Sequence, residues 1–144
     1  MDEKIPLDKA AVRRINPVTL AFVGDAVYSL YVRAKLVQSS DGKPSQLQRA
    51  TAKVVSAKGQ SQILEALLPC LTEEEGDIFR RGRNAKKPTK SKSASAGEYN
   101  RSTGLEAVLG YLYLTGDKAR LEELLSLLPQ ELFVVEEPPK VYKP

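Results

Sequence analysis

Two stretches of this 144-residue chain are almost free of charge, and they constrain its fold more than any other feature. Residues 16–32 contain a single charged side chain, Asp25, and residues 102–116 contain only Glu106. Asn16-Pro17 at the start of the first stretch and Gly116 at the end of the second are typical helix boundaries. A helix that is apolar on nearly every side is expected at the centre of a bundle. The sequence therefore predicts an all-α fold in which two almost wholly buried helices form the centre.

Breakers and capping residues divide the rest of the chain into shorter helices. A Ser-Ser-Asp-Gly-Lys-Pro run ends the first helix, Ser45 is the expected cap of the second, and Ser56 or Lys58-Gly59 separates the second from the third. A further helix starts at a capping box over residues 72–75. The predicted helices cover roughly residues 17–37, 46–55, 57–68, 73–82, 102–115 and 117–128.

Residues 84–98 differ from the predicted helices in composition. They are rich in Lys, Ser, Ala, Pro and Gly and contain no large apolar side chain, so we expect a flexible basic loop there. The chain then divides into an N-terminal segment (1–15), a core domain (16–128) that contains this loop, and a C-terminal tail (129–144) that is irregular from Phe133 onward.

The positive charge of the chain is concentrated in one segment. The net charge is +4, but residues 80–92 carry seven Lys and Arg side chains and no acid, whereas residues 117–144 are net acidic. A basic cluster of this density favours a polyanionic partner such as nucleic acid. The alternative is a solvated loop that only keeps the protein soluble.

The rarest residue types exclude several kinds of chemistry. The chain has no histidine and one cysteine, Cys70, so catalytic triads that use histidine, histidine metal ligands and multi-cysteine zinc sites are excluded. We expect Cys70 to be inert and packed. No signal-peptide pattern is visible, and the most apolar stretch is too short to span a membrane. These features favour a cytoplasmic protein with no membrane partner.

The lone acids Asp25 and Glu106 are the best candidates for a chemical role. A buried carboxylate is costly unless a partner, a cap or a metal ion compensates for its burial. Glu106 follows Thr103 at capping-box spacing, so a structural role is one alternative, and Asp25 could instead bind a cap elsewhere in the fold. Two carboxylates on facing helices suit Mg²⁺, which takes oxygen ligands and keeps several waters. Together with the basic segment, they suggest a metal ion that promotes attack of water on a phosphodiester.

Two sequence runs carry a resemblance to a known family. Leu-Ala-Phe-Val-Gly-Asp-Ala-Val (20–27) resembles the first ribonuclease III signature, and Thr-Gly-Leu-Glu-Ala-Val-Leu-Gly-Tyr-Leu-Tyr-Leu (103–114) resembles the second. The resemblance covers about residues 15–128. Where the family pattern has further acids, this chain has Val18, Ala21 and Thr103, and it leaves no room for a C-terminal RNA-binding domain. These departures are typical of the compact Mini-III branch, which residues 55–60 and 81–86 also resemble.

The resemblance implies a Mg²⁺-dependent endoribonuclease that cuts double-stranded RNA, leaves 5′-phosphate ends and works as a homodimer with a helical ribonuclease III-like fold. For the Mini-III branch it implies maturation of 23S (large-subunit) ribosomal RNA. A ribosomal protein could present that RNA to the enzyme. The alternative is a catalytically inactive ribonuclease III-like module that binds RNA or the ribosome, which the missing acids favour. A helical protein-interaction module is a third reading, but it leaves Asp25 unexplained.

Candidate site residues follow from both lines of reasoning. Asp25 and Glu106 are the expected metal ligands and catalytic residues, and Thr103 is expected to orient a water molecule. The four tyrosines at positions 28, 31, 111 and 113 are expected to pack in the core or a dimer interface rather than to stack on bases. The candidate RNA-binding residues are polar or basic and lie near the motifs: Arg81, Arg83, Asn84, Lys86, Lys87, Lys58, Gln60 and Arg101.

Overall fold

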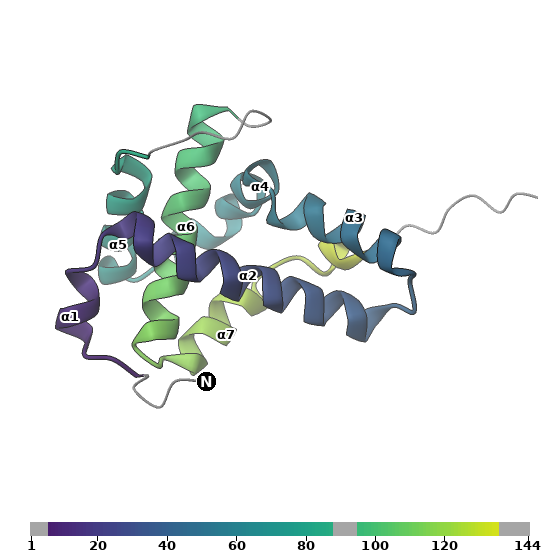
Figure 1. The fold of residues 1–144 in the computed structure, drawn as a ribbon, viewed down its shortest axis with the longest axis horizontal. Helices are drawn as coiled ribbons and strands as arrows, with labels where there is room; N and C mark the ends of the chain where they lie inside the picture. Colours follow the sequence, from purple (N-terminus) through teal and green to yellow (C-terminus); the bar gives the residue numbers. More distant parts are fainter. Residues whose placement is uncertain (1–5, 88–94, 136–144) are drawn as a thin grey trace, which may run out of the picture.

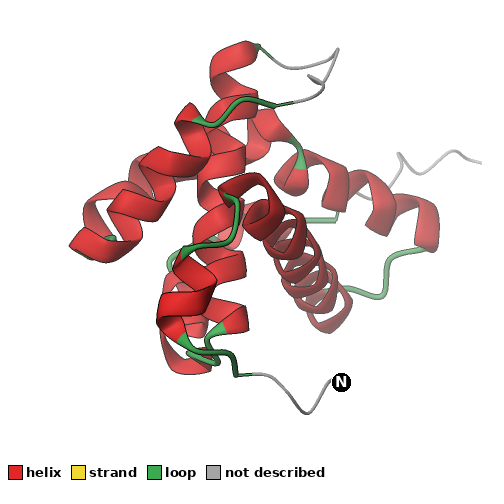
Figure 2. Cartoon of the chain, turned by 60° about the vertical axis from the view of Figure 1, so that its left-hand side comes forward, coloured by secondary structure: helices red, strands yellow, loops and turns green. Residues whose placement is uncertain are grey.

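The computed structural model describes residues 6–87 and 95–135, and every regular element in them is helical (Figures 1 and 2). The all-α prediction is therefore confirmed for these residues. The α-helices are α1 (Lys9–Arg13), α2 (Pro17–Ser39), α3 (Pro44–Val55), α4 (Ala57–Leu67), α5 (Glu73–Asn84), α6 (Ala96–Leu114) and α7 (Lys118–Ser126), and the short 3₁₀ helices are η1 (Leu68–Cys70) and η2 (Gln130–Phe133).

Local caps explain most of the helix boundaries. The Asn16 side chain accepts a hydrogen bond from the Val18 N–H at 2.8 Å, and Ser56 caps α4 by accepting from the Gly59 N–H at 3.0 Å. Ser56 is thus the residue that separates α3 from α4. The predicted capping box at the start of α5 is present. The prediction that Ser45 caps α3 is wrong, because α3 already begins at Pro44 and the Gln46 side chain accepts from the Lys43 N–H at 2.7 Å.

Helix α6 begins six residues earlier than its apolar pattern predicts. Ser95 and Glu98 form a capping box that starts the helix at Ala96, so the predicted loop over 84–98 is too long. Residues 88–94 of that loop lie outside the described residues. The early start places Thr103 inside the helix, where its hydroxyl donates to the Tyr99 carbonyl at 2.9 Å. The alternative in which Thr103 and Glu106 form a capping box is therefore wrong.

The closest contact in the fold is the crossing of α2 over α6 (Figure 1). A Cβ atom placed on Gly24 would lie 1.7 Å from the Glu106 carbonyl oxygen, and one on Gly110 would lie 2.0 Å from the Leu20 carbonyl oxygen. The two helices thus touch backbone to backbone, which only glycine allows at these positions. This crossing fixes the position of both signature motifs.

The core of the fold surrounds this crossing. Tyr28 is fully buried, Tyr111 is 2% exposed, and the leucines of α7 pack inward as predicted. The Tyr31 ring packs edge to face on Phe133 of η2, so the first part of the tail is ordered. The expectation that Cys70 is packed is wrong, since it is exposed at the end of η1.

Helix α2 departs from the expectation that it is almost wholly buried. One of its faces carries large apolar side chains that nothing in the described chain covers: Phe22 is 80% exposed, Leu30 69% and Val37 63%. The spacing of these residues, with Ala26 and Arg33 between them, places them on one stripe of the helix. A helix with this exposed stripe is only half covered in a single chain. Among the described residues, no helix combines the length and hydrophobicity that a membrane crossing requires.

Candidate active site

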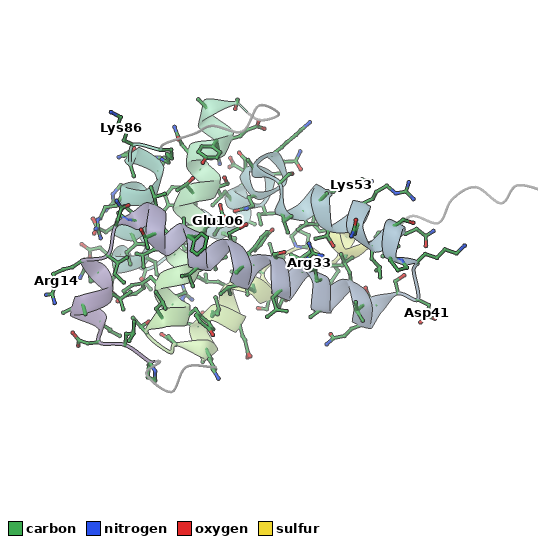
Figure 3. The ribbon with its side chains drawn as sticks, in the orientation of Figure 1. Arg14, Arg33, Asp41, Lys53, Lys86 and Glu106 are labelled. Atoms are coloured by element: carbon green, nitrogen blue, oxygen red, sulfur yellow. The ribbon has the colours of Figure 1, made fainter. Side chains whose placement is uncertain are left out.

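Asp25 and Glu106 are brought together where α2 crosses α6, although they are far apart in the sequence. Figure 3 shows Glu106 at this crossing. Asp25 lines the same cavity as Glu106 and is close enough to raise the pKa of its carboxyl group. Gly24 lies directly before Asp25 and contacts the Glu106 carbonyl, so this backbone contact places the two acids beside each other at the helix crossing. Glu106 is half-buried, as predicted for a lone acid in an apolar helix. Asp25 is exposed, contrary to that expectation, because it lies beside the uncovered stripe of α2.

The electrostatics of the pair favour a single negative charge. The pKa of Glu106 is raised from 4.5 to about 9, first by burial and then by the hydrogen bond and the charge of Asp25. A hydrogen bond from Gln60 acts in the opposite direction. Burial and the charge of Glu106 also raise the pKa of Tyr28. Because a nearby cation favours the ionised form of both carboxyl groups, this is an arrangement that a cation can stabilise.

A cavity of about 380 Å³ opens over the acid pair. Its walls come from three helices that carry the candidate residues, α2, α4 and α6, together with the end of α3. Thr103 lies in this wall, one turn before Glu106, and is 6% exposed. Its hydroxyl donates to Tyr99, which leaves the Thr103 oxygen free to accept a hydrogen bond. The polar groups that line the cavity are Asp25, Gln60, Tyr99, Ser102, Thr103 and Glu106.

Gln60 lies in this cavity and not on the basic surface where the sequence placed it. Its side chain is 2% exposed, and its Nε2 donates to the Val55 carbonyl at 3.0 Å. Direct contact between this side chain and RNA is therefore not compatible with the structure. The residue type alone gave no signal of this, because burial of a glutamine depends on how α4 packs against α6.

The structure divides the basic candidates into two groups. Arg83, Asn84, Lys86 and Lys58 are exposed. The other three are engaged: Arg81 donates to the Arg13 carbonyl at 2.9 Å, Lys87 donates to the Gly82 and Arg83 carbonyls at 2.7 and 2.8 Å, and Arg101 pairs with Glu65 at 3.3 Å. RNA contact by these three side chains would compete with these bonds.

Three of the exposed candidates, Arg83, Asn84 and Lys86, lie close to the cavity, whereas Lys58 lines a different one. A Cβ atom on Gly82 of α5 would lie 3.1 Å from the Thr103 carbonyl oxygen, so the end of α5 packs against the turn of α6 that precedes Glu106. Arg83, Asn84 and Lys86 follow directly after this contact, and Figure 3 labels Lys86 at this end of the molecule. The acid pair and these exposed donors therefore share one region of the surface.

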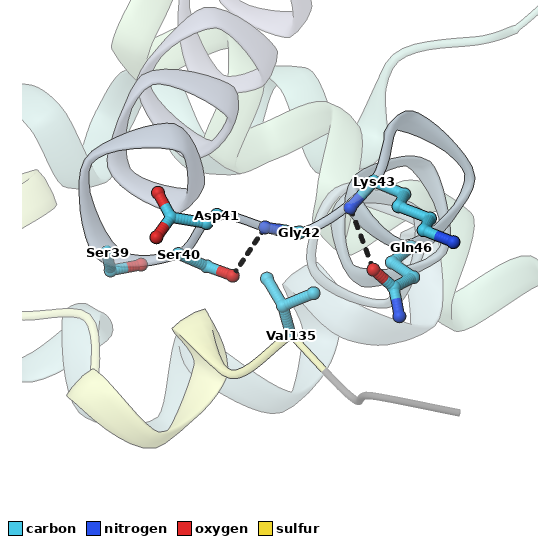
Figure 4. Close-up of a pocket in the computed structure, with 7 residues that line it drawn as sticks. All are labelled: Ser39, Ser40, Asp41, Gly42, Lys43, Gln46 and Val135. Atoms are coloured by element: carbon cyan, nitrogen blue, oxygen red, sulfur yellow. Dashed lines mark hydrogen bonds between the residues drawn. The ribbon is translucent and has the colours of Figure 1, made fainter. Parts of the chain in front are cut away.

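A second cavity, of about 530 Å³, lies at the far end of α2, where the chain turns into α3 (Figure 4). Its polar groups bind one another locally: the Gly42 N–H donates to Ser40 Oγ at 3.0 Å, and the Lys43 N–H donates to Gln46. Asp41 is the one acid among the described residues of its lining. The described part of this lining does not contain a pair of carboxylates, so the candidate site remains the one at the helix crossing.

The residues at the crossing fit a Mg²⁺ ion that keeps most of its water. No group of three or more acidic, histidine or cysteine side chains occurs within residues 6–87 and 95–135, so a site with many protein ligands is not present there. Two neighbouring carboxylates are sufficient for Mg²⁺, which usually binds proteins through one or two such groups. The buried Gln60 Oε1, which has no hydrogen-bond partner among the described residues, adds an oxygen beside them.

The raised pKa of Glu106 predicts how the stability of the metal-free protein depends on pH. In the unfolded chain this carboxyl group ionises near pH 4.5, whereas in the folded protein it keeps its proton up to about pH 9. Its contribution to stability is therefore complete below pH 4.5 and is lost as the pH rises toward 9. Urea unfolding in a chelating buffer is expected to give a higher midpoint at the acidic end of this window. Glu106→Gln is expected to flatten the profile, and an equally steep profile in that variant would contradict the assignment.

Comparison with known proteins places the fold and the motifs in one family. The Ribonuclease III domain model matches residues 18–117, which include both signature runs and the helix crossing. The chain therefore belongs to the ribonuclease III family.

The relatives are similar over nearly the whole described chain. Mini-ribonuclease 3 of Thermoanaerobacter sp. (strain X514) is 45% identical over 131 residues, which cover 91% of this chain and 90% of that protein. Mini-ribonuclease 3 of Symbiobacterium thermophilum is 48% identical over 112 residues, covering 78% and 86% of the two chains. A crystal structure of a Fusobacterium nucleatum protein matches with a TM-score of 0.72 and 29% identity, over 81% of this chain and 93% of that one. These matches confirm the resemblance to the Mini-III branch.

Proposed function

We propose that the protein is an endoribonuclease that cleaves double-stranded RNA in an active site formed by Asp25 and Glu106. The observation that carries the proposal is the proximity of these two carboxyl groups in an open cavity at the α2–α6 crossing. Family membership supports the same reaction, since the relatives are named ribonucleases. The test is incubation of the protein with duplex RNA and with single-stranded RNA of the same sequence, each with and without Mg²⁺. Cleavage of the duplex alone, and only with Mg²⁺, is the expected result.

The proposed mechanism assigns a distinct task to each group. Asp25 and Glu106 are the residues that would hold a Mg²⁺ ion, since their carboxylate oxygens are the ligands that this ion prefers. When bound, such an ion activates water and stabilises the charge that develops on the phosphate. The Thr103 oxygen, whose proton is engaged by Tyr99, accepts a hydrogen bond from a water molecule and orients it. The products would carry 5′-phosphate ends, as the family resemblance implies.

The exposed donors suit a phosphate backbone. Double-stranded RNA is recognised mostly by shape, through phosphates and 2′-hydroxyl groups. Arg83, Asn84, Lys86 and Lys58 offer charged and neutral donors without a bulky aromatic among them. Tyr28 and Tyr111 do not take part in this surface, since both are buried. We therefore assign the first contacts with RNA to these four residues.

RNA binding is expected to weaken steeply with salt. Each phosphate contact adds about 0.9 to the slope of log affinity against log salt, so Lys86→Ala should reduce that slope by roughly 1. Binding is measured on the Asp25→Asn variant, which should not cut the RNA, at several salt concentrations. Lys118→Ala, which removes an exposed lysine at the start of α7, serves as the control and should leave the slope unchanged. A slope that Lys86→Ala does not alter would remove this residue from the interface.

We further propose that the enzyme is a homodimer that pairs through α2. The support is the exposed apolar stripe of that helix, with Phe22 80% and Leu30 69% exposed. Contiguous apolar surface of this kind is typical of an interaction site. Asp25 lies next to the stripe, so a dimer formed there would bring two acid pairs close to one interface.

Leu30→Glu is expected to convert the dimer to a monomer, because it places a charge in the apolar contact. Sedimentation velocity measures the change directly. The matched control is Val134→Glu, since Val134 is 61% exposed but lies outside α2. A wild-type protein that sediments as a monomer, or a Leu30→Glu variant that still sediments as a dimer, would contradict the proposed interface.

The biological substrate that we propose is the precursor of large-subunit (23S) ribosomal RNA, processed in the cytoplasm. The resemblance to the Mini-III branch supports this substrate, and a ribosomal protein is a suitable partner to present it. The second candidate function is an inactive RNA- or ribosome-binding module, which the absence of acids at Val18, Ala21 and Thr103 favours. Incubation with precursor RNA separates the two, since the module would bind without Mg²⁺-dependent cleavage.

A further inference from the structure

The mechanism above gives no role to two buried polar side chains that line the cavity, Ser102 and Gln60, and of the two only Gln60 has a polar atom without a hydrogen-bond partner among the described residues. Gln60 sits in the first turn of α4, lines the same cavity as Asp25 and Glu106, and is 2% exposed. A buried amide must make its hydrogen bonds inside the protein. The partners that it has, and the partner that it lacks, therefore indicate what it does.

The amide nitrogen of Gln60 connects the end of α3 to the catalytic carboxyl group. Nε2 donates to the Val55 carbonyl at 3.0 Å, and because that acceptor is a carbonyl, the orientation of the amide is fixed. The Gln60 side chain also lies close enough to Glu106, in the same cavity, to lower the pKa of that carboxyl group as a hydrogen-bond donor would. The two amide protons can serve these two acceptors, so Gln60 holds Glu106 relative to a fixed point of the backbone.

The chain around Gln60 is tightly built. Ser56 caps α4 through the Gly59 N–H, and a Cβ atom on Gly59 would lie 2.1 Å from the Lys53 carbonyl oxygen. The α3–α4 junction is thus held by a cap and by direct backbone packing. Gln60 follows Gly59 immediately, so its Cα position is set by this junction rather than by a loop.

The amide oxygen of Gln60 lacks a hydrogen-bond partner among the described residues. Leaving a buried acceptor unsatisfied costs about 1–3 kcal/mol. When a cation keeps both neighbouring acids ionised, they can only accept hydrogen bonds, so in that state the donor for this oxygen comes from something that enters the cavity. The hydration water of a cation is a donor of this kind, and it would lie beside the two carboxylates that attract the cation.

We propose that Gln60 is a positioning residue of the metal site: its amide nitrogen holds the Glu106 carboxyl group, and its oxygen accepts a hydrogen bond from water bound to the cation. This inference rests on the proposed function, because it requires a divalent cation at Asp25 and Glu106. Outer partners that orient metal ligands typically contribute about 10–100-fold to metal affinity. Gln60 would supply that contribution with a neutral side chain, where another carboxylate would repel the pair.

The test is titration of the RNA-free protein with Mn²⁺ in a calorimeter. Gln60→Met keeps the volume but removes both hydrogen-bonding functions, and it is expected to raise the Kd for Mn²⁺ by about 10–100-fold. Gln46→Met is the matched control, because Gln46 is also buried, at 8% exposure, but binds Lys43 at the far end of α2 (Figure 4). This control is expected to lose stability without a change in the Kd.

A second measurement separates positioning from a general structural role. In cleavage assays, Gln60→Met should raise the Mg²⁺ concentration needed for half-maximal rate, and saturating Mg²⁺ should restore most of the rate. A variant that binds Mn²⁺ as tightly as the wild type, or that loses rate without any shift in its Mg²⁺ requirement, would overturn the proposal. If Gln60→Met does not fold, the shorter amide in Gln60→Asn replaces it, with the same expected direction. Failure of the wild-type protein to bind Mn²⁺ would instead overturn the metal site of the proposed function.

Discussion

Asp25→Asn or Glu106→Gln is expected to reduce cleavage of double-stranded RNA by at least about a thousandfold while leaving the fold intact. Each change removes one of the two carboxylates that would hold the cation, and the other described side chains that line the cavity are neutral. Stabilisation of the charge on the phosphate contributes several kcal/mol to such reactions. Single-turnover cleavage with enzyme in excess measures the effect without interference from product release.

The expected stability of the Glu106→Gln variant provides an internal control. Glu106 keeps its proton to about pH 9 in the metal-free protein, so a neutral glutamine at that position should not destabilise the fold at neutral pH. Glu122→Gln, which neutralises an exposed acid on α7, should retain full activity. Normal cleavage by either Asp25→Asn or Glu106→Gln would show that the acid pair is not the catalytic centre.

Gly24→Ala is expected to destabilise the protein by at least about 3 kcal/mol, enough to unfold many domains of this size. The added methyl group would lie 1.7 Å from the Glu106 carbonyl oxygen. The methyl group is attached directly to the backbone of α2 and the oxygen belongs to the backbone of α6, so neither can rotate away. To fit it, α2 must move away from α6, which also separates Asp25 from Glu106. Urea or thermal unfolding, followed by circular dichroism, measures the loss.

The control for this prediction is a glycine on the same central helix. Gly97 lies in the first turn of α6, and a Cβ atom there would approach nothing closer than Ser95 Oγ at 4.0 Å. Gly97→Ala should therefore stabilise the protein slightly, since alanine favours helix more than glycine does. If Gly24→Ala were as well tolerated as Gly97→Ala, the backbone contact between α2 and α6 would not be essential to the fold.

The helix boundaries show where local sequence was informative. Asn16 and Thr72 were identified as caps, and Ser56 as one of two possible boundaries, because the groups that they bind lie within three residues along the chain. The early start of α6 was missed although Ser95 and Glu98 form the same kind of capping box. The composition of residues 84–98 predicted a loop, and that prediction ignored the capping box that Ser95 and Glu98 form within the same segment.

The sequence identified only some residues of the candidate site, because local patterns are visible in a sequence and contacts between helices are not. A lone acid in an apolar helix is visible in the sequence, so Asp25 and Glu106 could be selected before the fold was known. The partners of Arg81, Arg101 and Gln60 could not be selected, because they lie on other helices. Basic residues that look equivalent in the sequence therefore differ in exposure and in their partners only in three dimensions.

The sequence by itself determined that the chain is helical, where most helices begin, and which two acids are set apart from all others. The tertiary structure decided that these acids line one cavity, that Gln60 is buried beside them, and that one face of α2 is left uncovered. The physical reason is the range of the interactions. Caps and helical periodicity depend on neighbours a few residues away, whereas the α2–α6 crossing depends on Gly24 and Gly110, which meet only when the whole core packs.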